Sequence, residues 1–83
     1  MNYMAEVRLR IGAGTDLSWI RQSLDAACRR VDGARAVQIL SAVHIPDDGR
    51  LSCVVRAANR EDVRRLFEMA LLPSARVLEV VEI

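Results

Sequence analysis

The chain has 83 residues, of which twelve are basic and eleven acidic, giving a formal net charge of +1. This length holds one small domain, and the balanced charge excludes the strong positive field that draws proteins onto nucleic acid or anionic membranes. Hydrophobic residues make up 52% of the sequence, which is enough for a packed core and excludes a disordered tail. We therefore expect residues 1–83 to fold as a single domain.

The setting of the chain follows from its apolar runs and its cysteines. No apolar run is long enough to span a membrane, and residues 1–6 lack the basic and apolar regions of a secretory signal. We therefore expect no membrane association and a cytoplasmic location. Cys28 and Cys53 are expected to be free thiols, because a chain without a secretion signal rarely forms disulfides.

The first third of the chain predicts a strand followed by a helix. From Tyr3 to Ile11 the apolar residues occupy odd positions, which is the period-2 pattern of a half-buried strand. Gly12 and Gly14 end this strand, and Thr15 or Asp16 can cap the helix that follows. Apolar residues then recur at helical spacing as far as Asp32-Gly33, and these are Leu17, Ile20, Leu24, Ala27, Cys28 and Val31.

Residues 37–57 predict a hairpin. Residues 37–45 form an extended run that ends at Pro46-Asp47-Asp48-Gly49, where Asp-Gly favours the positive φ of a tight turn. Residues 51–57 alternate as the second strand of this hairpin. One of its faces carries Leu51, Cys53, Val55 and Ala57.

The last third predicts a second helix and a last strand. Asn59 is expected to cap the helix, with Asp62 three residues further on, and Pro73 prevents its continuation. Its apolar stripe consists of Val63, Leu66, Phe67, Ala70 and Leu71. Residues 76–83 form the last strand. The order β-α-β-β-α-β predicts an α+β, ferredoxin-like fold, with two helices on one face of a four-stranded antiparallel sheet.

The parity of the strands predicts which side chains remain on the open face of the sheet. If the odd residues of the first and third strands face the helices, pairing across the Pro46–Gly49 turn places Leu40, Ala42 and His44 on the helix side. The residues then expected on the open face, as an apolar dimer interface, are Val37, Ile39, Val43, Ile45 and Val54. A register shifted by one residue would instead make this face the core.

Few residues suggest chemistry. His44 is the single histidine, and together with Cys53 and Cys28 it could supply ligands for nickel or zinc; the alternative is a packed histidine and two inert thiols. The sequence offers no other ligand pair at metal-binding spacing, no complete catalytic triad and no paired carboxylates outside turns and helix starts. The glycines before Thr15 lack the third glycine of a dinucleotide-binding loop.

Recognition of RNA is not expected, although RNA-recognition domains share this architecture. Those domains stack bases on aromatic side chains of the central strands. Here the open-face positions of these strands are expected to hold Glu6, Arg8, Arg10, Ser52, Val54 and Arg56. None of these is aromatic.

Short motifs carry a resemblance to one family. They are Val43-His44-Ile45-Pro46-Asp47-Asp48, Cys53, Ala57-Ala58-Asn59, Ala70-Leu71-Leu72-Pro73 and Val77-Leu78-Glu79-Val80. The chain resembles the small bacterial proteins of domain-of-unknown-function family 4242, the nickel-binding-protein-like group. The resemblance implies a ferredoxin-like fold and a homodimer.

The chain departs from that family at the positions that matter for metal. Metal-binding members carry histidines on the second helix and just before the following proline, whereas this chain has Phe67 and Leu72 there. Leu71 replaces the usual glycine. Apolar side chains cannot bind nickel, so the resemblance supports fold and assembly more than metal binding.

Three functions are therefore compatible with the sequence. The first is a non-catalytic, homodimeric module that binds a small ligand or another protein and has no cofactor. The second is a nickel- or zinc-binding protein that uses His44, Cys53 and Cys28. The third is a cofactor-free enzyme of the dimeric α/β-barrel kind, of the monooxygenase or cyclase type, with His44 as base in an apolar cavity.

Overall fold

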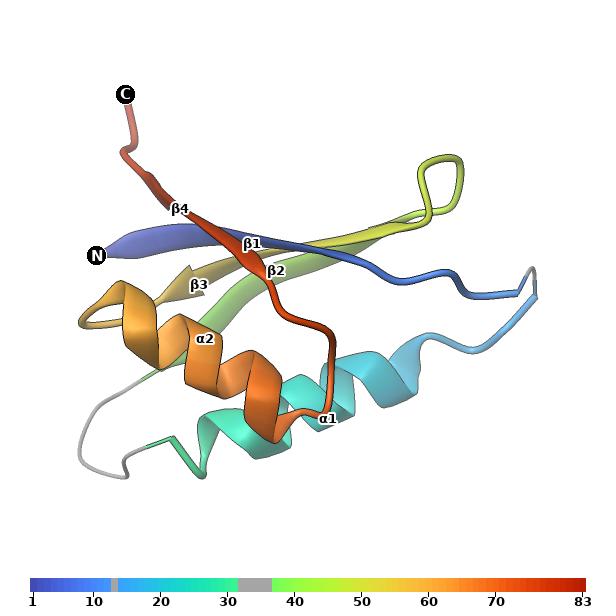
Figure 1. The fold of residues 1–83 in the computed structure, drawn as a ribbon, viewed down its shortest axis with the longest axis horizontal. Helices are drawn as coiled ribbons and strands as arrows, with labels where there is room; N and C mark the ends of the chain where they lie inside the picture. Colours follow the sequence, from blue (N-terminus) through green and yellow to red (C-terminus); the bar gives the residue numbers. More distant parts are fainter. Residues whose placement is uncertain (13, 32–36) are drawn as a thin grey trace.

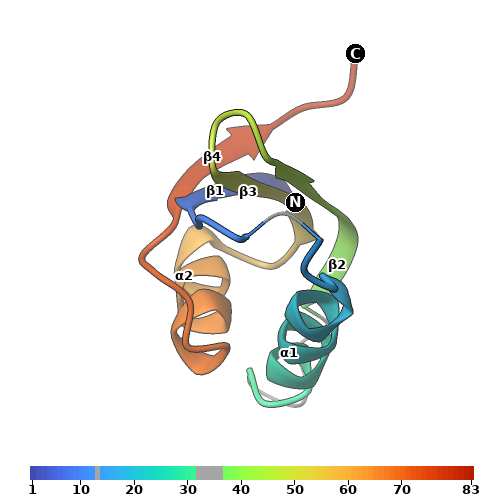
Figure 2. The same ribbon diagram turned by 90° about the vertical axis from the view of Figure 1, so that its right-hand side faces the viewer.

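The computed structural model describes residues 1–12, 14–31 and 37–83. Its elements are β1 (Asn2–Arg8), α1 (Ser18–Cys28), β2 (Gln38–Ile45), β3 (Arg50–Arg56), α2 (Arg60–Met69) and β4 (Arg76–Val80). The strands form one antiparallel sheet in the order β2-β3-β1-β4. Both helices lie on the same side of this sheet, and its other side is left open (Figure 1; Figure 2). The predicted α+β, ferredoxin-like fold is confirmed.

The two central strands alternate as their sequence predicts. Tyr3, Ala5 and Val7 of β1 are buried, as are the residues of β3 that pair with them. Those residues are Val55, Cys53 and Leu51. The helices cover this face with their apolar stripes, so one core lies between the sheet and the two helices. Its largest fully buried helix side chains are Phe67, Leu24, Leu66 and Val63.

Strand β2 corrects part of the predicted pattern. Val37 and Ile39 were expected on the open face, but they are 7% and 6% exposed and belong to the core, while Leu40 is 38% exposed. The cause is a β-bulge: Ile39 pairs with Val55 and Ser41 with Val54, which leaves Leu40 without a pairing residue. The extra residue reverses the parity of the strand, and bulges are common on edge strands such as β2.

Beyond the bulge the predicted parity of β2 is correct. Ala42 and His44 are half-buried on the helix side, and Val43 and Ile45 lie on the open face. The hairpin turn after Ile45 is also confirmed, because Gly49 has a φ of 57° and its N–H donates to the carbonyl of Pro46 at 3.2 Å.

The predicted cap of α2 is present, whereas the N-cap of α1 is Leu17, not Thr15 or Asp16, and has no side-chain cap hydrogen bond. The Asn59 side chain accepts a hydrogen bond from the Asp62 N–H at 2.9 Å, which is the predicted cap of α2. At the start of α1, Asp16 Oδ1 accepts from the Ser18 N–H at 2.9 Å, and this bond lowers the pKa of the Asp16 carboxyl. The predicted end of this helix at Asp32-Gly33 lies outside the described residues.

The end of α2 departs from the prediction at Leu71. This residue was assigned to the apolar stripe, but it is 91% exposed and has a φ of 58°. It closes the helix in the left-handed conformation, and the following N–H of Leu72 donates to the Phe67 carbonyl at 3.0 Å. The expected role in the core was therefore wrong.

No helix in the described part of the chain is both long and apolar enough to cross a membrane.

Candidate functional site

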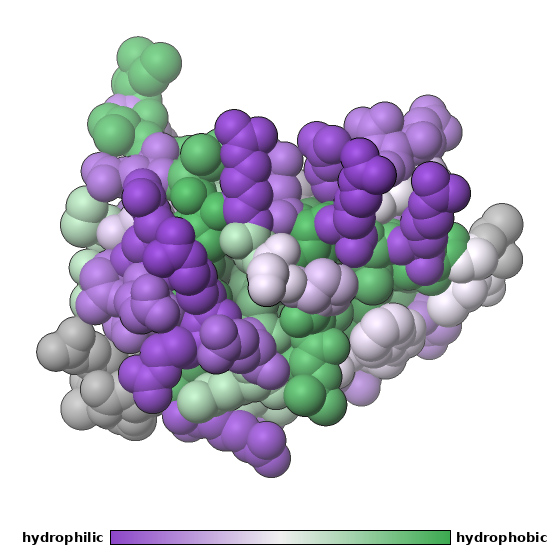
Figure 3. Space-filling model, in the orientation of Figure 1, coloured by the Kyte–Doolittle hydropathy of each residue, from purple (hydrophilic) through white to green (hydrophobic). Residues whose placement is uncertain are grey.

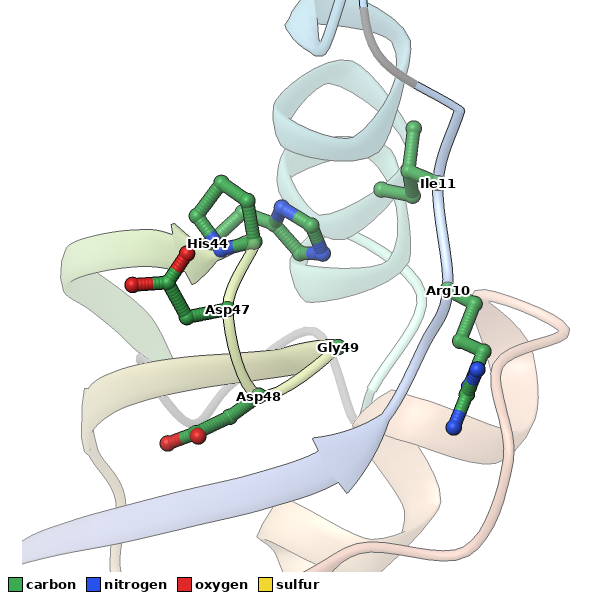
Figure 4. A pocket seen from close by; sticks show the side chains of 7 residues that line it. Arg10, Ile11, His44, Asp47, Asp48 and Gly49 are labelled. Carbon is green, nitrogen blue, oxygen red and sulfur yellow. The ribbon is translucent and has the colours of Figure 1, made fainter.

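His44 stands at the end of β2 beside a polar hollow of about 250 Å³. This hollow lies between the hairpin turn and the segment after β1 that carries Arg10 and Ile11. Figure 4 shows the imidazole pointing toward that segment, whereas the carboxylates of Asp47 and Asp48 point away from it. The acidic groups and the histidine therefore do not converge.

One nitrogen of His44 is already engaged. His44 Nε2 lies 2.9 Å from the carbonyl oxygen of Leu9. A carbonyl can only accept, so Nε2 donates this bond, and in the neutral ring Nδ1 carries the free lone pair. The side chain also borders a second hollow of about 120 Å³, whose apolar lining includes Leu17 and Ile20. The site therefore offers a single proton acceptor, the Nδ1 atom of His44.

The two thiols are poor nucleophiles and poor ligands. Cys53 is buried in the core, and burial raises the pKa of its thiol to about 11. Cys28 is half-buried on α1, and burial, together with the nearby Asp25 carboxylate, raises the pKa of this thiol too. A thiol with a raised pKa is protonated near neutral pH, and the thiol is a much weaker nucleophile and metal ligand than the thiolate.

The predicted metal set is not brought together. Among residues 1–12, 14–31 and 37–83, no three His, Cys, Asp or Glu side chains lie close enough to hold a metal ion. His44 and Cys53 share a face of the hairpin, but His44 pairs with Leu51 and Cys53 with Ala42, so they occupy different rows of the sheet. The expectation that His44, Cys53 and Cys28 converge on one ion is therefore not met by their placement.

The open face of the sheet carries a continuous apolar band. Val54 pairs with Met4, and Met4 pairs with Leu78 on the other side, so one row of apolar side chains crosses three strands. On β2, Val43 lies diagonally next to Val54, in the row of Ser52, and Ile45 lies one row further on; on β4, Val80 lies one row beyond Leu78 in the opposite direction. The band runs from one corner of the sheet to the opposite corner, and we call it the apolar diagonal: Ile45, Val43, Val54, Met4, Leu78 and Val80.

One corner beside the apolar diagonal is basic. Arg8 pairs directly with Arg50 across β1 and β3, and Arg76 pairs with Glu6 across β4 and β1. These four side chains, which we call the basic corner, line a hollow of about 160 Å³. In Figure 3, hydrophilic side chains stand along the upper border, above the strands, with hydrophobic side chains between and beneath them.

The aromatic residues lie elsewhere. Tyr3 and Phe67 are buried in the core, and Trp19 lies on α1. The open face thus offers charge and aliphatic surface for contacts, and no stacking platform for bases.

The sequence pattern identified only part of this face. Of the five residues predicted for the interface, Val43, Ile45 and Val54 lie on it, and Val37 and Ile39 do not. Met4, Leu78 and Val80 were missed, although the even positions of β1 and β4 carry the signal that finds them: when odd residues face the core, even residues face outward. Arg10, also placed on this face, lies beyond the end of β1 and against Gly49, where it lines the hollow next to His44.

No protein-family model and no curated protein matches the chain. Among solved structures, it is similar to the crystal structure of SCO4226 from Streptomyces coelicolor A3(2), with a TM-score of 0.79 and 22% sequence identity. The similarity covers 96% of this chain and 95% of that chain. At this identity the likeness shows the fold alone, and membership of family 4242 stays a prediction.

Proposed function

We propose that this chain is a non-catalytic, homodimeric module that binds a small ligand or another protein, and that two copies associate through the open face of the sheet. The observation that carries this proposal is the apolar diagonal. Val43 is 53% exposed, Ile45 is exposed on the same strand, and Leu78 is exposed at the other end of the diagonal. Soluble monomers seldom leave such a contiguous apolar surface in water, because covering it is favourable.

The charge arrangement favours a second copy as the occupant. A two-fold axis along the diagonal lays the apolar band of one copy on that of the other, which is the self-complementarity that a symmetric dimer requires. The same rotation carries each basic corner over the β2 edge of the other copy, where Ser41 and Gln38 are uncharged and Arg56, which pairs with Gln38, is the one basic residue of the row. An axis across the diagonal would instead oppose the two basic corners, so the first arrangement is favoured.

The chain after β4 supports a contact on the same side. Figures 1 and 2 both show this segment leaving the sheet on the side opposite the helices. Its apolar side chains have few neighbours, since Val81 is 78% exposed and Ile83 is exposed as well. A second copy on the open face would give these side chains a surface to contact.

The absence of catalysis in this proposal rests on the site chemistry. In the described part of the chain, His44 combines a free ring nitrogen with a neighbouring hollow, and both thiols have raised pKa values. Among residues 1–12, 14–31 and 37–83, no nucleophile and no second acid-base group is hydrogen-bonded to His44, and general catalysis needs such a pair.

Sedimentation velocity over about 1–100 μM protein tests the association. We expect the wild type to sediment as a dimer that dissociates on dilution, and Val43→Arg to sediment as a monomer at all concentrations. Leu71→Arg is the matched control, because it places the same charge on an exposed leucine outside the open face. A monomeric wild type, or a Val43→Arg variant that still dimerises, would contradict the proposal.

A further inference from the structure

The basic corner holds more positive charge than the chain neutralises. Its three guanidinium groups share one carboxylate, that of Glu6, whose Oε2 lies 3.4 Å from Arg50 Nη1. Within the described residues, Arg8 and Arg76 take part in no ion pair. Two guanidinium groups therefore present unused hydrogen-bond donors to the same hollow.

The placement of these arginines has an energetic cost. Arg8 and Arg50 are direct cross-strand neighbours, and like charges directly opposite each other destabilise a sheet. An anion bound between them would remove this cost. The proposed second copy does not supply one, because the region that it lays over this corner carries Ser41, Gln38 and Arg56, none of which is acidic.

The residues around the basic corner indicate the chemistry of the rest of the ligand. The apolar row of Val54, Met4 and Leu78 lies about 7 Å along the strands from the row of Glu6 and Arg76, and about 14 Å from the row of Arg8 and Arg50. A ligand whose charged end lies in the basic corner therefore places its other end on aliphatic side chains. Arg8 and Arg76 each offer N–H donors to one oxygen of a carboxylate, so a carboxylate head group fits this corner.

We propose that the basic corner binds the carboxylate of a small amphipathic organic acid, through Arg8 and Arg76, with the apolar body of the acid along Met4, Val54 and Leu78. The guanidinium fork matches the two oxygens of a carboxylate. This inference rests on the proposed ligand-binding role of the open face, and it names the ligand class. The acid and the second copy contact the same apolar row, Met4, Val54 and Leu78, so in the dimer the acid lies between the two copies.

Titration of the full chain with sodium octanoate, followed by calorimetry and by amide NMR shifts, tests this site. We expect saturable binding with shifts at Arg8, Arg76, Met4 and Leu78. Sodium acetate lacks the apolar body and is expected to bind about tenfold or more weakly. Arg76→Gln and Arg8→Gln are each expected to weaken octanoate binding by about tenfold, because each removes a charge-assisted hydrogen bond. Arg65→Gln, an exposed arginine on α2, is the matched control and is expected to bind as the wild type does.

Three results would contradict this inference. Absence of saturable octanoate binding, or binding unchanged in both variants, would overturn the site. Inorganic phosphate binding more tightly than octanoate would overturn the ligand class. Sedimentation of the same samples separates this inference from the dimer: a monomer that binds octanoate through Arg8 and Arg76 supports the site while refuting self-association.

Discussion

The two faces of the sheet are made by the same strands and yet differ in what covers them. On the helix side, alternate residues of β1 and β3 are apolar without exception, and each is buried within the chain. On the open side, the intervening residues form an aliphatic diagonal beside a basic corner. The side chains of the covered face are packed within this chain, whereas the open face carries unpaired charge and exposed aliphatic surface.

This difference separates folding from binding. The covered face accounts for most of the stability of the fold, because its β1 and β3 side chains are buried against the helices. The open face contributes little to that stability, so its composition is free to serve a partner or a ligand. Substitutions on the open face should therefore leave the stability of the fold unchanged, and substitutions in the core that keep the chain folded should leave binding at the open face unchanged.

The largest effect is expected in the core. Phe67→Ala should lower the free energy of unfolding by about 3–5 kcal/mol, because Phe67 is fully buried and its removal leaves a cavity. Leu78→Ala on the open face should cost less than about 1 kcal/mol. Urea unfolding at low protein concentration, followed by circular dichroism, measures both. Equal losses would erase the distinction between the faces.

A smaller effect is expected from the thiol beneath the sheet. Because burial raises the pKa of Cys53 from 9.0 to about 11, the unfolded chain releases this proton at lower pH than the folded chain does. Its contribution to stability is thus complete below pH 9 and is lost as the pH rises toward 11, at up to about 1.4 kcal/mol per pH unit. Urea unfolding at a series of pH values measures this slope. Cys53→Ala should flatten it, and a slope unaltered by that substitution would refute this origin.

A substitution at the C-terminal end of α2 should stabilise the fold. Leu71 adopts a positive φ and is almost fully exposed, so its side chain costs conformational energy without contributing packing. Leu71→Gly should raise the free energy of unfolding by about 1 kcal/mol, since glycine adopts this conformation without strain. Leu71→Ala keeps the strain and should give no comparable gain. Thermal unfolding of the two variants compares them, and equal midpoints would argue against backbone strain.

The smallest effect on folding is expected in the basic corner. The Glu6–Arg50 pair spans 3.4 Å with both side chains partly exposed. Glu6→Gln should therefore change the free energy of unfolding by less than about 0.5 kcal/mol, because water screens such pairs. Urea unfolding of this variant measures the change. A loss of several kcal/mol would mean that the open face helps to hold the fold.

Much of this fold is predictable because local signals and burial agree. The alternation of Tyr3, Ala5 and Val7, the cap at Asn59 and the turn at Gly49 each specify one conformation, and the structure has all three. The bulge at Leu40 is not predictable in this way, since no glycine or proline marks it. The prediction of faces from odd and even positions assumes that strand residues pair one to one. The unpaired Leu40 breaks this assumption, so Val37 and Ile39 were predicted on the wrong face.

The candidate site was predictable only in part. The exposure of Val43 and Ile45 follows from parity beyond the bulge, and the even positions of β1 and β4 would have added Met4 and Leu78. The basic corner depends on which strands are neighbours, because Arg8, Arg50 and Arg76 come from three separate segments. Spacing along the sequence does not reveal such a cluster. Leu71 was misplaced because a leucine at helical spacing normally indicates the core.

In the proposed dimer, a second copy covers the open face of the sheet. The most direct measurement is methyl NMR with a soluble paramagnetic probe, recorded for Val43, Val54 and Leu78 at several protein concentrations. The proposal predicts that these methyl groups become protected from the probe as concentration rises, while the Leu71 methyl groups stay accessible throughout. Methyl groups of Val43, Val54 and Leu78 that remain accessible at every concentration would contradict it.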